Sequence, residues 1–155
     1  IDAVEMMDRI ARQTESYLWT HNVYGTVVKS VSDETAIPIW DAVANSMSQL
    51  AHDLRVRAVV VMSKSGMSAA TMSSARPAAP VIAITKSMDI CQKILMHWGI
   101  VPVLSEDIKE TSINELARKV TMEKGLVSEG DKILLVQGFQ SDVALNKPSV
   151  TILTI

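Results

Sequence analysis

The chain has 155 residues, of which 48% are apolar and 21% are charged, and this length and composition are typical of a single globular domain. Its formal net charge of −2 argues against a nucleic-acid-binding surface, and no apolar run reaches the ~20 residues of a membrane-spanning helix. The single cysteine, Cys91, excludes an internal disulfide, so we expect a cytoplasmic protein.

Helical and extended patterns alternate along the sequence. Helices are predicted where apolar residues recur at helical spacing, and strands where short β-branched runs are bounded by turn residues. In chain order we expect a helix at 1–19, a loop at 21–34, a helix at 36–54, a strand at 56–62, a helix ending at 75, a strand at 80–85, a helix at 88–98, a strand at 100–104, a helix at 112–124, and strands at 132–137 and 150–155.

The order of these elements predicts the fold class. Strands that alternate with helices form a mostly parallel sheet with helices on both faces. About twelve residues without a helical pattern separate the last two expected strands. Parallel neighbours need a longer connection, so we expect the final strand to be antiparallel. We therefore predict an α/β protein with three α/β/α layers around a five-stranded, mostly parallel sheet.

Residues 63–68, with the sequence SKSGMS, stand between the first expected strand and a small-residue helix. In an open α/β sheet, ligands bind at the carboxyl ends of the strands, where a helix N-terminus offers unpaired N–H groups. The serine hydroxyls, the lysine charge and the glycine suit a phosphate. The alternative is that Ser65 is only a helix N-cap and Gly66 only a turn residue. Neither G-x-x-x-x-G-K-[ST] nor G-x-G-x-x-G occurs in the chain, so no nucleotide motif decides between them.

Six segments in a fixed order carry a resemblance to a known family: AVEMMDRIARQTE, ETAIPIWDAVANSMSQLA, AVVVMSKSGMSA, ARPAAPVIAIT, GIVPVL and GLVSEGDKILLVQG. Together they resemble the C-terminal domain of pyruvate kinase, and the resemblance spans the whole chain. It implies that residues 1–20 are the last helix of a catalytic (β/α)₈ barrel with its connection, and that residues 21–155 are the C-terminal domain. We therefore expect a piece of a longer chain.

The resemblance also implies what the chain does. The parent enzyme would transfer a phosphoryl group from phosphoenolpyruvate to ADP, with magnesium and usually potassium. The family's barrel, with its catalytic and metal-binding residues, is missing, so we expect no catalytic residue, metal site or cofactor here. The expected role is regulation and assembly, with homo-oligomers formed through a helix and the final strand at 150–155.

In many members of this family the C-terminal domain binds a phosphorylated effector, often fructose 1,6-bisphosphate. One effector phosphate lies in a loop that residues 63–68 match. The resemblance therefore favours an effector phosphate site over a helix cap, and the candidate residues are Ser63, Lys64, Ser65, Gly66 and Ser68.

The second half of the family's bisphosphate site differs in this chain. The corresponding loop at 139–149 contains no glycine, carries Asp142, and has Lys147 as its only cation. Ile113 stands near the position where some members have an effector-binding arginine. We therefore expect a sugar monophosphate, AMP or inorganic phosphate rather than fructose 1,6-bisphosphate. A possible second effector loop comprises Gln140, Ser141, Asn146 and Lys147.

Two other interpretations stay open. The first alternative is a stand-alone phosphometabolite-binding module. The second is a small α/β transferase, which would need a general base or metal set near residues 63–68. His21, His52 and His97 are scattered, so they are expected to be surface or packing residues rather than ligands. Cys91 is expected to be buried on its helix.

Overall fold

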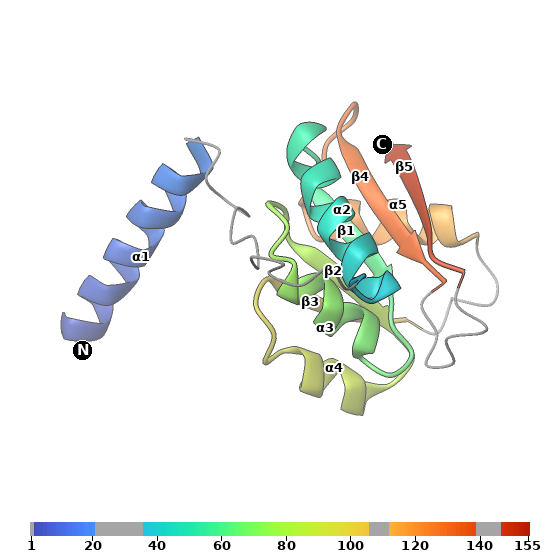
Figure 1. The fold of residues 1–155 in the computed structure, drawn as a ribbon, viewed down its shortest axis with the longest axis horizontal. Helices are drawn as coiled ribbons and strands as arrows, with labels where there is room; N and C mark the ends of the chain where they lie inside the picture. Colours follow the sequence, from blue (N-terminus) through green and yellow to red (C-terminus); the bar gives the residue numbers. More distant parts are fainter. Residues whose placement is uncertain (1, 21–35, 106–111, 139–146) are drawn as a thin grey trace. The chain divides into compact units, whose positions relative to one another are not determined.

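The computed structural model describes residues 2–20, 36–105, 112–138 and 147–155 (Figure 1). The chain divides into two compact units, Ile1–Thr35 and Ala36–Ile155. The first unit contains helix α1 (Asp2–Thr20), which confirms the helix predicted at 1–19. The loop predicted at 21–34 lies outside the described residues. The assignment of residues 1–20 to a catalytic barrel stays a prediction.

A five-stranded sheet forms the centre of the second unit, in the order β3-β2-β1-β4-β5. The first four strands of the chain run parallel to one another. The last strand is antiparallel to its neighbour, with Val150 opposite Val136, so the predicted sheet is confirmed. The strands are β1 (Ala58–Met62), β2 (Val81–Thr85), β3 (Ile100–Leu104), β4 (Lys132–Gln137) and β5 (Ser149–Thr154).

Helices cover both faces of this sheet and give the predicted three layers (Figure 1). Side chains alternate between the two faces along each strand. On β1, Val59 and Val61 therefore pack in the core beneath α2 (Ile39–Asp53), α3 (Met67–Ser74) and α4 (Met88–Ile94). Val60 faces the other way and packs in the core beneath α5 (Ile113–Glu123).

Two helices differ from their predicted bounds. Helix α2 begins at Ile39 rather than at 36, because Pro38 occupies the N-cap position and disfavours helical backbone at the residue before it. Helix α4 ends at Ile94 rather than at 98. Beyond that point His97 N–H bonds to the Ile94 carbonyl at 3.1 Å, a tighter i→i+3 turn. The Ser73 hydroxyl donates to the Trp98 carbonyl at 2.7 Å, which ties the start of β3 to α3.

Within the described ranges, none of the helices combines the length and the apolar character that crossing a membrane requires.

Candidate functional site

The 63–68 segment leaves the sheet at its central strand. The chain runs from β1 to β2 and β3 on one side and then returns to β4 on the other side of β1. This reversal of strand order is a topological switch point, where open α/β sheets bind their ligands beyond the carboxyl ends of the strands. Residues 63–68 therefore lie at the carboxyl ends of the strands, where a ligand site is expected.

Ser63 is the first residue beyond β1. Its backbone N–H donates to the carbonyl of Ile84 on β2 at 2.9 Å, so its position is fixed by the sheet. Its side chain is 2% exposed, and its Oγ has no hydrogen-bond partner among the described residues. A buried hydroxyl without a partner costs about 1–3 kcal/mol, and such groups are rare in folded proteins. The hydrogen-bonding capacity of this hydroxyl is therefore unused among the described residues.

Gly66 sets the start of α3. It occupies the N-cap position with φ +90°, in the left-handed region that favours glycine. A Cβ at this position would lie 3.1 Å from Cγ2 of Ile94, so there is little room for a side chain. The first helical bond joins the N–H of Ala70 to the carbonyl of Gly66. The interpretation of Ser65 as the N-cap is thus wrong.

The N-terminus of α3 is also without a side-chain cap. The first N–H groups of a helix have no partner within the helix, and together they carry a partial positive charge. Such a terminus binds anions. The uncapped terminus and the buried Ser63 hydroxyl belong to the same short segment, which makes this part of the chain suited to a phosphate.

The remaining predicted residues of the segment divide by exposure. Ser68 is buried in the first turn of α3, whereas Lys64 and Ser65 are exposed. Lys64 therefore presents its charge to solvent. None of these three side chains caps the helix, because the start of α3 receives no side-chain cap hydrogen bond.

Most of the predicted second effector loop falls outside the described residues: Gln140, Ser141 and Asn146. Lys147 is described and exposed. Its N–H donates to the carbonyl of Gly138 at 3.1 Å, which closes the connection between β4 and β5. Because β4 is parallel to β1 and paired with it, Lys147 lies at the same edge of the sheet as residues 63–68. Ile113 is half-buried and packs against the core beneath α5.

The other singled-out residues take no part in this site. Cys91 is buried, as expected. His97 is exposed, and His52 lies 3.3 Å from the Asp53 carboxylate, while His21 is outside the described ranges. Among the described residues, no three or more His, Cys, Asp or Glu side chains are grouped so that they could hold a metal ion.

A family model described as pyruvate kinase, alpha/beta domain, matches residues 41–151. The chain belongs to this family. A pyruvate kinase from Agrobacterium vitis is 34% identical over 140 residues, which are 90% of this chain and 28% of that protein. A pyruvate kinase from Clostridium acetobutylicum is 29% identical over 149 residues, covering 93% of this chain and 30% of that protein.

A third relative, pyruvate kinase 2 from Synechocystis sp., is 27% identical over 145 residues, 93% of this chain and 23% of that protein. The resemblance to the pyruvate kinase C-terminal domain is therefore confirmed. The chain spans about 28% of the length of the Agrobacterium vitis relative. It corresponds to one part of a pyruvate kinase, and the family match includes the 63–68 segment, strands β1 to β4 and the first residues of β5.

Proposed function

We propose that this chain is the regulatory and assembly domain of a cytoplasmic pyruvate kinase and that a phosphorylated effector binds at residues 63–68. The whole enzyme would transfer a phosphoryl group from phosphoenolpyruvate to ADP with Mg²⁺ and K⁺, using residues outside this chain. The observation that carries the effector site is the buried, unpartnered hydroxyl of Ser63 beside the uncapped N-terminus of α3.

The proposed binding mode uses the backbone first. Phosphate oxygens accept hydrogen bonds from the N–H groups at the start of α3. The buried hydroxyls of Ser63 and Ser68 donate from below, and Lys64 supplies a charge from the solvent side. The left-handed backbone at Gly66 lets the chain approach the phosphate closely, because no side chain stands in the way.

The effector we favour has one phosphate. A second phosphate would need cations from the other loop at this edge, and Lys147 is its only one. Ile113 supplies no charge from the start of α5, and Asp142 would repel an anion. A sugar monophosphate, AMP or inorganic phosphate therefore suits the site better than fructose 1,6-bisphosphate.

Calorimetric titration of the chain with five compounds tests the proposal. They are ribose 5-phosphate and glucose 6-phosphate as sugar monophosphates, AMP, inorganic phosphate and fructose 1,6-bisphosphate. We expect a monophosphate to bind, and Lys64→Ala to weaken its binding by about 1–3 kcal/mol through loss of a charge-assisted contact. Lys124→Ala is the matched control, because it removes an exposed lysine at the C-terminal end of α5. Equal affinity in Lys64→Ala and the control would remove Lys64 from the anion site.

The assembly role is proposed from β5. This strand is at the edge of the sheet, its Ile152 side chain is 50% exposed, and an uncovered edge strand is a template for pairing. Pairing with a second copy through this strand would satisfy both edges symmetrically. Light scattering after size exclusion should give an oligomer for the chain and a monomer for Ile152→Lys. A monomer for the unmodified chain at all concentrations would refute the pairing.

A further inference from the structure

A second lysine, Lys86, stands beside residues 63–68 at the carboxyl ends of the strands. Strands β1 and β2 are parallel neighbours, with Met62 opposite Ile84. Lys64 and Lys86 each follow this pair by two residues, so they leave the two strands at matching positions. Neighbouring strands lie about 4.8 Å apart, which brings both lysines within reach of one small ligand.

Hydrogen bonds hold the backbone around Lys86. Thr85, the last residue of β2, is buried. Its hydroxyl accepts the N–H of Ser87 at 3.3 Å, and its carbonyl accepts the N–H of Ser105 at 2.9 Å. Lys86 itself is exposed, as is Lys64. Both ammonium groups are therefore presented to solvent just beyond the strand ends.

The charges of the two lysines are not neutralised by acidic side chains in the part of the chain that the structure describes. None of the ion pairs found there includes Lys64 or Lys86. Asp89, in the first turn of α4, is the acidic residue nearest to Lys86 along the chain, and it takes part in none of these pairs either. Like charges at neighbouring strand ends repel each other. A ligand with more than one negative charge removes this repulsion.

The end of β1 also offers two uncharged groups that bind a phosphate oxygen. Ser63 is 2% exposed, and its Oγ has no hydrogen-bond partner among the described residues. Ser63 follows Val61 by two residues, and alternation along a strand places its side chain on the face that α3 covers. Helix α3 begins without a side-chain cap. A phosphate held by these groups lies within reach of the flexible four-carbon side chains of Lys64 and Lys86.

We propose that Lys86 is a further ligand-binding residue of this site. Together with Lys64 it makes the site selective for a doubly charged phosphate monoester over a singly charged ester of the same shape. The Lys86 ammonium group contacts the phosphate from the β2 side, and Lys64 contacts it from the β1 side. Sulfate esters and phosphodiesters carry one charge and are disfavoured. The inference rests on the proposed function, because it requires a phosphate at residues 63–68.

Nuclear magnetic resonance titration of the isotopically labelled chain tests this inference. The probes are methyl phosphate and methyl sulfate, which have the same shape and differ by one negative charge. The titrations are made at about pH 8, above the second pKa of a phosphate monoester, which is about 6. We expect both compounds to shift the amide signals of residues 63–68 saturably, and methyl phosphate to bind about tenfold more tightly than methyl sulfate.

Three variants assign the selectivity to Lys86. Lys86→Gln is expected to weaken methyl phosphate binding about tenfold and methyl sulfate binding about threefold or less, so the selectivity falls. Lys86→Arg keeps the charge and should retain the selectivity of the unmodified chain. Lys93→Gln is the matched control, because it removes an exposed lysine from the last turn of α4, and it should leave both dissociation constants unchanged. Positions 86 and 93 are exposed, so the fold should persist.

The outcomes separate this inference from the proposed function. The role of Lys86 is overturned, while the effector site stands, if methyl phosphate binds Lys86→Gln and the control equally well. The same conclusion follows if methyl sulfate binds the unmodified chain as tightly as methyl phosphate does, or if Lys86→Arg loses as much affinity as Lys86→Gln. If neither compound shifts the signals of residues 63–68 saturably, both the inference and the effector site are overturned.

Discussion

At the scale of single residues, the effect of the Ser63 hydroxyl on stability distinguishes a ligand site from a structural cap. A hydroxyl that holds the fold together stabilises it, whereas a buried hydroxyl without a partner destabilises it until a ligand arrives. We expect Ser63→Ala to raise the free energy of unfolding by about 1 kcal/mol in the absence of ligand and to weaken phosphate binding. Urea unfolding and calorimetry measure the two effects. Ser65→Ala, which removes an exposed hydroxyl, should leave stability unchanged. Destabilisation by Ser63→Ala would point to a structural role.

Both the left-handed backbone at position 66 and the nearby Ile94 side chain favour glycine there. Gly66→Ala should lower the free energy of unfolding by about 2 kcal/mol or more, because a left-handed residue with a Cβ costs about 1–2 kcal/mol and the new Cβ lies 3.1 Å from Ile94 Cγ2. Gly99→Ala is the matched control: its φ is +68°, yet a Cβ there meets nothing within 4 Å. The difference between the two variants in urea unfolding isolates the contact, and equal losses would show that it is unimportant.

The sequence pointed to this segment but not to which of its side chains are buried and which are exposed. Serine and lysine next to an expected helix start are visible as a pattern. Which hydroxyl is buried depends on how β1 ends beside β2 and on how Ile94 of α4 packs over Gly66. Those contacts join residues that are far apart in the chain, so the local pattern left open an N-cap at Ser65, one residue before the observed N-cap at Gly66.

At the scale of elements, α3 and the start of β3 are joined by the hydrogen bond from Ser73 to the Trp98 carbonyl. We expect Ser73→Ala to lower the free energy of unfolding by about 1–2 kcal/mol, because a part-buried bond between distant elements is lost. Ser74→Ala is the control, since the Ser74 hydroxyl is exposed and bonds within its own helix to the Thr71 carbonyl. Urea midpoints at unchanged m-value measure both. A loss in the control as large as in Ser73→Ala would contradict the linking role.

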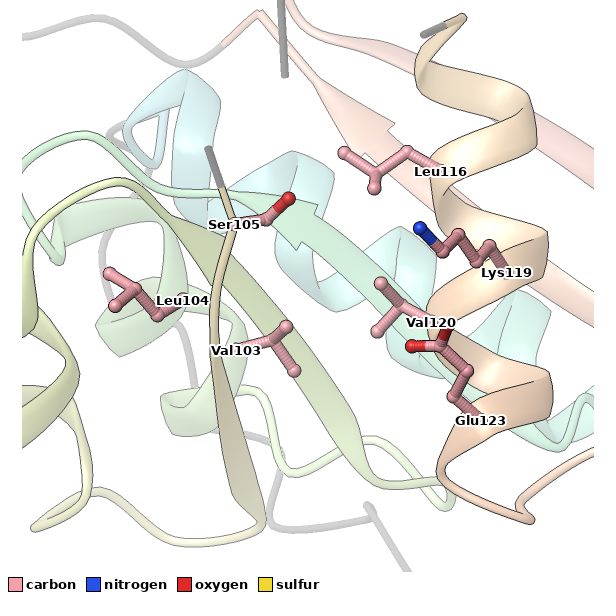
Figure 2. A pocket seen from close by; sticks show the side chains of 7 residues that line it. All are labelled: Val103, Leu104, Ser105, Leu116, Lys119, Val120 and Glu123. Carbon is pink, nitrogen blue, oxygen red and sulfur yellow. The ribbon is translucent and has the colours of Figure 1, made fainter. Parts of the chain in front are cut away.

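The helices and strands were easier to predict than the residues at which they end, and the hydrogen bond from Ser73 to Trp98 gives one reason. The alternation of apolar runs and helical periods determined the parallel sheet and the antiparallel β5, because both follow from connection length. No residue between Ile94 and Gly99 breaks a helix, so the sequence extended α4 to 98. The helix ends earlier because the Trp98 carbonyl accepts a hydrogen bond from the Ser73 hydroxyl. The depression lined by Ser105 and Lys119 (Figure 2) was also missed, since only the folded sheet brings these two distant residues to one pocket.

At the scale of the whole molecule, the two units differ in what stabilises them. Both core clusters of the described residues draw their members from the second unit, between Val43 and Ile155. Along α1, by contrast, large apolar side chains such as Val4, Met7 and Ile10 are exposed. Burial of apolar area is the dominant favourable term in folding, so a shortened chain of residues 36–155 contains the contacts that its core needs.

We therefore expect residues 36–155 to unfold cooperatively, with a free energy of unfolding within about 1 kcal/mol of the full chain, which corresponds to a few degrees in Tm. The candidate effector residues all lie within this unit, so monophosphate binding should persist as well. Differential scanning calorimetry and titration of both chains measure these two quantities. A shortened chain that unfolds without cooperativity, or that no longer binds a monophosphate bound by the full chain, would contradict this expectation.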